Sequence, residues 1–203
     1  MSYQSAAHCV YFKHSRRKLL ARDVFIIIGG HDLEQRHEVG RITQSPLKIH
    51  VHPDWNPSVD SYDADLATLQ LEHPLTFNSF IQPICLWETY NDPGVSKGIV
   101  IGYGRNETQD LQKIPRKIEI PLQTQDECFL SKPALAELSS KRTFCAGSAN
   151  GSGVCVGDSG GGMFIKFNGV YYLRGIVSSS LLRDDDSCDV DNYAIFTNVL
   201  KFK

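Results

Sequence analysis

The sequence predicts an all-β fold. Short runs of β-branched and aromatic residues recur along the chain, and residues typical of turns separate them. Eight such runs are 24–28, 48–51, 66–71, 98–103, 117–122, 163–167, 170–177 and 194–199. The chain has no internal repeat and no linker-like stretch, so we expect a single unit built as a pair of small barrels.

Three local patterns justify individual elements. The run 117–122 alternates polar and apolar residues with period two, which puts Ile118, Ile120 and Leu122 on one face of a strand. The pair Asn168-Gly169 stands between two strand-forming runs and predicts a type I′ hairpin, because both residues tolerate positive φ. Only 124–138 suggests a helix, and Pro133 interrupts it.

Composition excludes several classes of protein. The 203 residues are 41% hydrophobic and 22% charged, which is ordinary for a globular domain and argues against disorder. A formal charge of −2 gives no basic excess for nucleic acid. The longest apolar run, 24–28, is far too short to cross a bilayer. We therefore expect neither a nucleic-acid nor a membrane partner.

Cysteine usage indicates an oxidising compartment. The six cysteines are widely spaced and form no C-x-x-C pair, which argues against a zinc ribbon and for disulfides. They are Cys9, Cys85, Cys128, Cys145, Cys155 and Cys188. Two N-glycosylation sequons, 106–108 and 150–152, agree with a secreted glycoprotein.

The most informative stretch is 151–162, in which Ser159 stands among glycines. Glycines let a backbone present a hydroxyl outward and let amide N–H groups approach a substrate carbonyl closely. The segment 157–161 also fits the G-x-S-x-G elbow of α/β-hydrolases. That fold requires a histidine after the serine, yet all seven histidines precede Ser159. The α/β-hydrolase interpretation therefore fails.

A serine hydroxyl needs a base, and the base needs a carboxylate that orients it. His8 stands beside Cys9, which could fix it covalently. Asp65 stands at the entrance to an apolar strand, with Asp63 as a rival acid two residues earlier. Neither His8 nor Asp65 alone predicts a catalytic site. The prediction rests on their combination with Ser159.

With these motifs in this order, the chain resembles the chymotrypsin-like (S1) serine proteases. The motifs are Ala6-Ala7-His8-Cys9, Asp65-Leu66-Ala67 and Gly157-Asp158-Ser159-Gly160-Gly161. The resemblance implies two six-stranded antiparallel Greek-key barrels, the first incomplete, in one catalytic domain over 1–203. It further implies that the strands and activation site upstream of Met1 and the closing helix after 203 are absent, so we expect the chain as given to be inactive.

The resemblance assigns roles residue by residue. Ser159 would attack the scissile carbonyl, His8 would carry the proton, and Asp65 would hold the imidazole. Asp65 is preferred to Asp63 because it directly precedes an aliphatic-alanine pair. The backbone N–H groups of Gly157 and Ser159 would form the oxyanion hole, and Asp158 would pair with the amino terminus freed on activation.

Four positions match the primary substrate pocket. Gly153 stands at its base, where trypsin-like members carry aspartate, so an arginine or lysine side chain would enter unpaired. Ser178 matches a serine that lines the site and supports the acid. Ser180 and Ala194 replace smaller residues and should narrow the slot. We expect cleavage after small or medium apolar residues.

The cysteines follow the same resemblance, which pairs Cys128 with Cys145 and Cys155 with Cys188. Cys9 and Cys85 lack their usual partners. Cys85 matches the cysteine that tethers an amino-terminal regulatory segment, so regulatory domains of a longer, secreted zymogen are expected partners. Protein or peptide substrates and a serpin-type inhibitor are further expected partners.

No cofactor or metal is expected. The pair His50 and His52 could face one way on a strand and bind zinc, but a His-Pro after a β-run is typical of a loop in this family, so we expect no zinc site. The segment 31–34 resembles the family's calcium loop, but Gly30 replaces its first ligand, which leaves calcium doubtful despite Glu34 and Glu38. The alternative function is a non-catalytic protease homologue that acts as a binding or regulatory protein.

Overall fold

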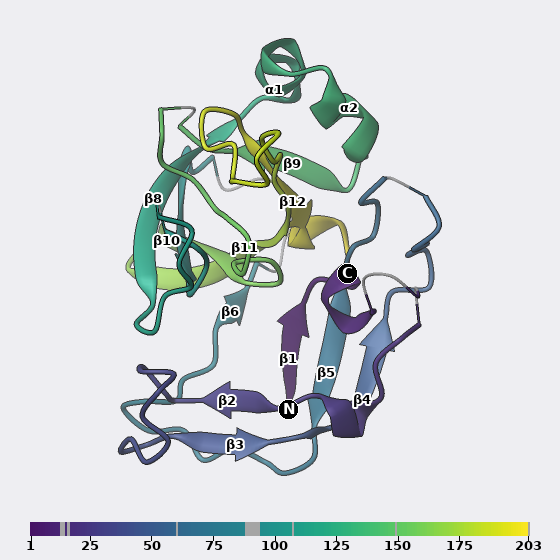
Figure 1. Cartoon of the computed structure of the whole chain (residues 1–203). Helices are drawn as coiled ribbons and strands as arrows, with labels where there is room; N and C mark the ends of the chain where they lie inside the picture. The colour runs from purple at the N-terminus through teal and green to yellow at the C-terminus, as the bar shows by residue number, and fades with distance from the viewer. Residues whose placement is uncertain are drawn as a thin grey trace.

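The computed structural model describes residues 1–12, 15, 17–59, 61–87, 94–106, 108–148 and 150–202. The fold is mostly β and has two halves, which are the amino-terminal strands and a carboxy-terminal barrel (Figure 1). The second half also carries the two α-helices at one end of its barrel. The all-β prediction is confirmed.

Six antiparallel strands close the barrel of the second half, in the order β10-β7-β8-β9-β12-β11 with β11 returning to β10. They are β7 Lys97–Gly102, β8 Arg116–Gln123, β9 Thr143–Ala146, β10 Gly162–Phe167, β11 Val170–Ser179 and β12 Ala194–Asn198. A short strand, β6 Cys85–Leu86, adds to β11 in parallel. The β10–β11 hairpin turns at Asn168 and Gly169, both at positive φ (49° and 83°), as the sequence predicts.

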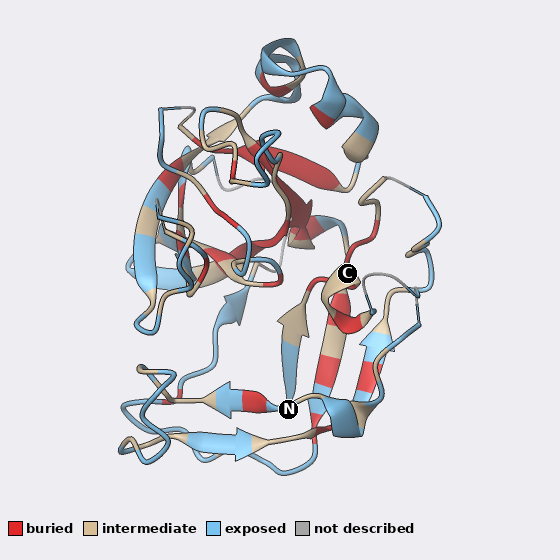
Figure 2. Cartoon of the chain, in the orientation of Figure 1, coloured by how far each residue is buried: buried red, intermediate tan, exposed pale blue. Residues whose placement is uncertain are grey.

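The barrel encloses the larger core (Figure 2). Ile120, Met163 and Phe196 are almost fully buried within it. Ile118 and Leu122 pack against the same cluster, so the face predicted from alternation in β8 is confirmed. This closed sheet is a rigid support for the loops that leave its strands.

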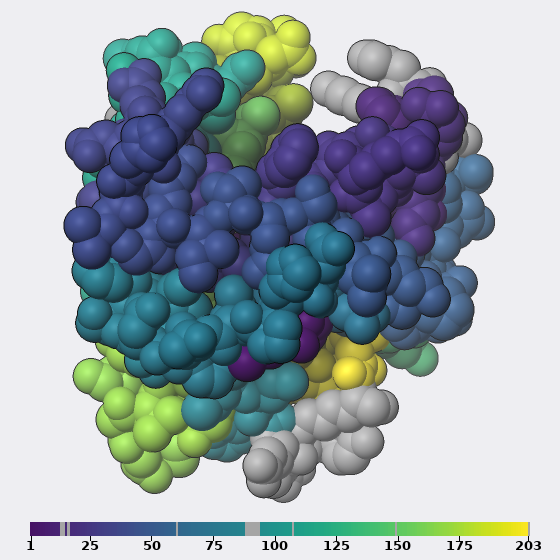
Figure 3. Space-filling model, turned by 90° about the horizontal axis from the view of Figure 1, so that it is seen from below, coloured from purple at the N-terminus to yellow at the C-terminus, as the bar shows by residue number. Residues whose placement is uncertain are grey.

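The first half is an open sheet, which agrees with the expectation that the first of the two barrels is incomplete. One sheet has the order β1-β5-β4, from Ser2–Ser5, Ala67–Leu71 and Pro46–Val51. A separate ribbon pairs β2 Ile26–Ile28 with β3 Ile42–Gln44. Within the described residues no strand joins the sheet to the ribbon, so the ladder cannot close. Figure 3 shows this half from below, with the dark blue ribbon region and the teal chain after β5 lying across the face.

The helices are short. The predicted helical stretch divides at Pro133 into α1 Gln125–Ser131 and α2 Ala134–Leu138. Thr124 and Glu127 cap α1 reciprocally, which satisfies two free N–H groups. Among the residues that the structure describes, three 3₁₀ turns complete the elements: His8–Val10, Ala21–Asp23 and Val199–Lys201. No helix among the described residues is long and apolar enough to span a membrane.

Candidate functional site

Asp65 lies where the two halves meet, and its side chain is fully buried. Its Oδ1 accepts the His8 backbone N–H at 2.8 Å, and its Oδ2 lies 2.8 Å from His8 Nδ1. Ser178, from β11, donates its hydroxyl to the same Oδ2 at 2.6 Å. Thr197, from β12, donates to the Asp65 carbonyl at 2.8 Å. The carboxylate therefore has partners in both halves, as a buried charge requires.

His8 opens a 3₁₀ turn that directly follows β1 and the buried pair Ala6-Ala7. Burial by itself would lower the pKa of His8, but hydrogen bonds to Asp65 and Cys9 outweigh it and raise the pKa. The ring of Tyr62 stands edge-on to the imidazole at 5.8 Å. The second ring nitrogen, Nε2, lies 3.5 Å from Cys9 Sγ.

Ser159 is exposed in the turn that precedes β10. The next residue, Gly160, has φ +80° and packs so tightly that a Cβ there would lie 2.3 Å from Ser5 Oγ and 3.2 Å from Cys9 Sγ. The structure thus brings the serine turn against the segment that carries His8. Within the described residues, however, no hydrogen bond joins Ser159 to His8.

Two backbone N–H groups of the serine turn differ from their neighbours, which donate to backbone carbonyls. In the part of the chain that the structure describes, neither the Gly157 nor the Ser159 N–H donates to another protein group. Gly157 has φ +99°, and a Cβ there would lie 3.1 Å from the Gly104 Cα. Only glycine fits such a backbone conformation and such a close approach without strain.

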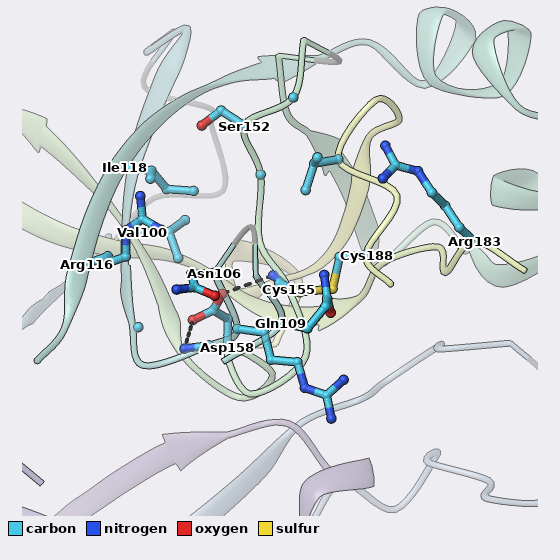
Figure 4. A pocket seen from close by; sticks show the side chains of 16 residues that line it. Val100, Asn106, Gln109, Arg116, Ile118, Ser152, Cys155, Asp158, Arg183 and Cys188 are labelled. Carbon is cyan, nitrogen blue, oxygen red and sulfur yellow. Dashed lines mark hydrogen bonds between the residues drawn. A yellow bond between two sulfur atoms is a disulfide. The ribbon is translucent and has the colours of Figure 1, made fainter. Parts of the chain in front are cut away.

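Asp158 borders a cavity of about 190 Å³ beside the serine turn (Figure 4). Its Oδ1 accepts the Gly104 N–H at 2.9 Å, and its Oδ2 accepts the Cys155 N–H at 3.0 Å. Gln109 lines the same cavity, and its buried Oε1 has no partner among the described residues. The Asp158 carboxylate and Gln109 Oε1 are therefore two acceptors available to a donor group that enters the cavity.

The four pocket positions are not all brought to this cavity. Gly153 lines it, and a Cβ there would meet the Val190 side chain at 3.5 Å. Ser178 instead turns to Asp65, and Ala194 packs in the barrel core. Ser180 is half-buried and is not among the described lining residues.

The rival acid faces elsewhere. The Asp63 carboxylate accepts from Ser140 Oγ at 2.6 Å and from Arg142 Nε at 2.9 Å. Sequence reasoning did not single out Arg142 or Thr197. No local pattern marks them, because their importance comes from contacts with residues more than 75 positions away.

The structure contains the disulfides Cys128–Cys145 and Cys155–Cys188, and it leaves Cys9 and Cys85 as free thiols. In the sequon 106–108, Thr108 donates to Asn106 Oδ1, while Glu107 lies outside the described residues.

The residues weighed as metal ligands have protein partners. The two oxygens of Glu38 accept the backbone N–H groups of His31 and Asp32, both at 2.8 Å. His52 Nδ1 accepts the Asp54 N–H at 3.2 Å. Among the described residues, no cluster of three metal-ligating side chains occurs.

A closed antiparallel barrel, a buried aspartate on a histidine and an adjacent serine turn together define the chymotrypsin-like class of fold. The family model described as Trypsin matches residues 4–203, so the chain belongs to the trypsin family. The chain is 33% identical to serine protease gd of Drosophila melanogaster over 98% of its length. It is 32% identical to mannan-binding lectin serine protease 1 of Mus musculus over 96% of its length. The chain spans only 44% and 28% of these two relatives.

Proposed function

We propose that the chain is the catalytic part of a secreted serine endopeptidase, with Ser159, His8 and Asp65 as its triad. The observation that carries the proposal is the 2.8 Å contact of His8 Nδ1 with the fully buried Asp65. An acceptor on Nδ1 holds the proton there, which leaves Nε2 as the base. Two relatives, serine protease gd and mannan-binding lectin serine protease 1, are named as serine proteases, which supports the same chemistry.

The reaction would proceed by acyl transfer. His8 Nε2 takes the Ser159 hydroxyl proton while Oγ attacks the scissile carbonyl, and the amine then leaves with that proton. Water, activated by the same nitrogen, hydrolyses the ester. The open N–H groups of Gly157 and Ser159 suit the oxyanion that forms in both steps, a contribution of about 10²–10³ in rate.

Gly153 gives a basic substrate side chain no carboxylate to pair with, and the side chain nearest to it is the apolar Val190. Asp158 also lines the cavity, but we assign it to the freed amino terminus and not to the substrate side chain. We therefore propose cleavage after small or medium apolar residues rather than after lysine or arginine.

Asp158 is proposed as the partner of an amino terminus that is freed on activation. A cavity that holds a carboxylate and the unpaired Gln109 Oε1 suits an ammonium group, which has three donors and no acceptor. Occupation would fix the turn 157–159 and with it the two oxyanion N–H groups. Cleavage of a precursor would then control activity, as expected of a zymogen in an extracellular proteolytic cascade.

One observation favours the alternative, a non-catalytic homologue that binds rather than cleaves. Within the described residues His8 Nε2 faces Cys9 Sγ instead of Ser159. A site that stays in this arrangement would not activate the serine.

Covalent labelling separates the two functions. We expect a serine-reactive phosphonate to label Ser159 slowly in the chain as given, and much faster when the dipeptide Ile-Val is added and its free amine enters the Asp158 cavity. The acetylated dipeptide is the control, because it keeps both side chains but has a neutral amide in place of the charged amine. His8→Ala and Ser159→Ala should abolish labelling. A folded chain that remains unlabelled with the free dipeptide present would support the non-catalytic alternative.

A further inference from the structure

The segment that carries Asp65 has a second attachment to the other half of the molecule. The Arg142 guanidinium binds both oxygens of Asp63, with Nε on Oδ1 at 2.9 Å and Nη2 on Oδ2. The Ser140 hydroxyl donates to Oδ1 at 2.6 Å. A forked pair of this kind fixes orientation as well as distance, because two parallel N–H groups match two oxygens.

Arg142 is itself held in place. Its Nη1 donates to Asp54 Oδ2 at 2.5 Å, and its carbonyl accepts the Asn198 N–H at 2.8 Å. The guanidinium also lies over the Phe202 ring, 5.5 Å from its centroid. The side chain is 27% exposed, so solvent screens it less than a free surface arginine. Arg142 holds the pKa of the Asp63 carboxyl below its usual range, which keeps that group ionised.

The two attachments come from neighbouring strands. Arg142 directly precedes Thr143, the first residue of β9, and Thr143 stands opposite Thr197 in β12. Thr197 donates to the Asp65 carbonyl, so adjacent ends of two barrel strands hold both Asp63 and Asp65. The residue between them, Ala64, is buried at φ +54°. A left-handed alanine is strained, and it persists only where its surroundings enforce it.

We propose that Arg142 is a positioning residue, which holds the Asp63-Ala64-Asp65 turn and thereby keeps the Asp65 carboxylate against His8. Arg142 does not touch the reacting atoms and acts only through Asp63. The inference rests on the proposed function for its catalytic meaning, but the geometry it concerns can be measured without turnover.

The decisive measurement is the pKa of the His8 ring, followed by NMR titration in Arg142→Gln. Loss of a cation alone would raise this pKa, because the charges of Asp54 and Asp63 would be left unbalanced. Loss of the Asp65 orientation would lower it towards about 6.5. We expect a fall of about one unit. The other groups that face the ring, Cys9 and Tyr62, are the same in both proteins.

Two further variants complete the test. Arg142→Lys keeps the charge but loses the fork, and we expect a smaller fall in the same direction; it carries the test if Arg142→Gln does not fold. Lys113→Gln removes an exposed pair with Glu34 (2.7 Å) and should leave the His8 pKa unchanged. A folded Arg142→Gln with an unchanged or raised His8 pKa would overturn the proposal, even if its melting temperature fell.

Phosphonate labelling connects the inference to catalysis. We expect Arg142→Gln to lower the maximal labelling rate at Ser159 by about tenfold, with the half-saturating concentration unchanged, because the pocket lies elsewhere. If the wild-type protein takes no label even with the free Ile-Val dipeptide present, the proposed function fails. The His8 titration would still decide whether Arg142 positions Asp65.

Discussion

The two halves of the molecule differ in how their sheets end. In the second half every barrel strand has a neighbour on each side, whereas in the first half β1 and β4 each pair only with β5 among the described strands. The closed half supplies the supports of the site, Ser178 and Thr197, and the open half supplies His8 and Asp65. The geometry of the site therefore depends on hydrogen bonds between the halves. The donors Ser178 and Thr197 lie on strands of the closed barrel, which fixes their positions.

The largest expected effect compares matched core residues. Ile120 lies in the closed barrel and Ile49 in the open sheet, and both are buried (1% and 6% exposed). We expect Ile120→Ala to lower the free energy of unfolding by about 4 kcal/mol and Ile49→Ala by about 2 kcal/mol, because an open sheet collapses more easily around a cavity. Urea denaturation measures both. Equal losses would mean that the open half is packed as rigidly as the barrel.

The next prediction concerns pH and the contact between His8 and Asp65. This contact lies within the first half, and Ser178 and Thr197 of the second half support it. The pKa of His8 is raised in the folded protein. Its contribution to stability is therefore complete below the unfolded pKa of about 6.5 and is lost as pH rises through the folded pKa, by up to about 1.4 kcal/mol per unit.

Urea denaturation of the wild type and of His8→Gln at a series of pH values measures this dependence. The quantity of interest is the difference between their free energies of unfolding. The stability advantage of the wild type should shrink steadily above pH 6.5. A difference that stays constant with pH would mean that Asp65 does not stabilise the imidazolium.

The smallest effect compares two glycines with nearly the same φ, one in each half. Gly169 (φ +83°) has open space where a Cβ would stand, whereas at Gly40 (φ +85°) a Cβ would lie 2.5 Å from the Phe80 ring. We expect Gly169→Ala to cost about 1 kcal/mol from the backbone alone, and Gly40→Ala to cost more because Phe80 must shift. Thermal unfolding of the two variants tests the order. If Gly169→Ala destabilised the protein more than Gly40→Ala, Phe80 in the open half would be able to shift without a loss of stability.

Strand positions were largely predictable, because a period of two and turn residues are local properties. All eight runs overlap strands of the structure, and the Asn168-Gly169 turn is confirmed. The strands that were missed, β1, β3, β6 and β9, have two to four residues. They exist because a partner strand pairs with them, which a short run of sequence does not reveal.

Local sequence patterns were enough to identify the residue types that could do chemistry and their order along the chain: His8, Asp65 and Ser159. Tertiary structure decided the rest, because each remaining relation joins residues far apart in the chain. It placed Asp65 rather than Asp63 on His8, directed Asp63 to Arg142, and closed one barrel while leaving the other half open. A buried carboxylate adopts the position in which all its donors converge, and those donors come from strands that only folding brings together.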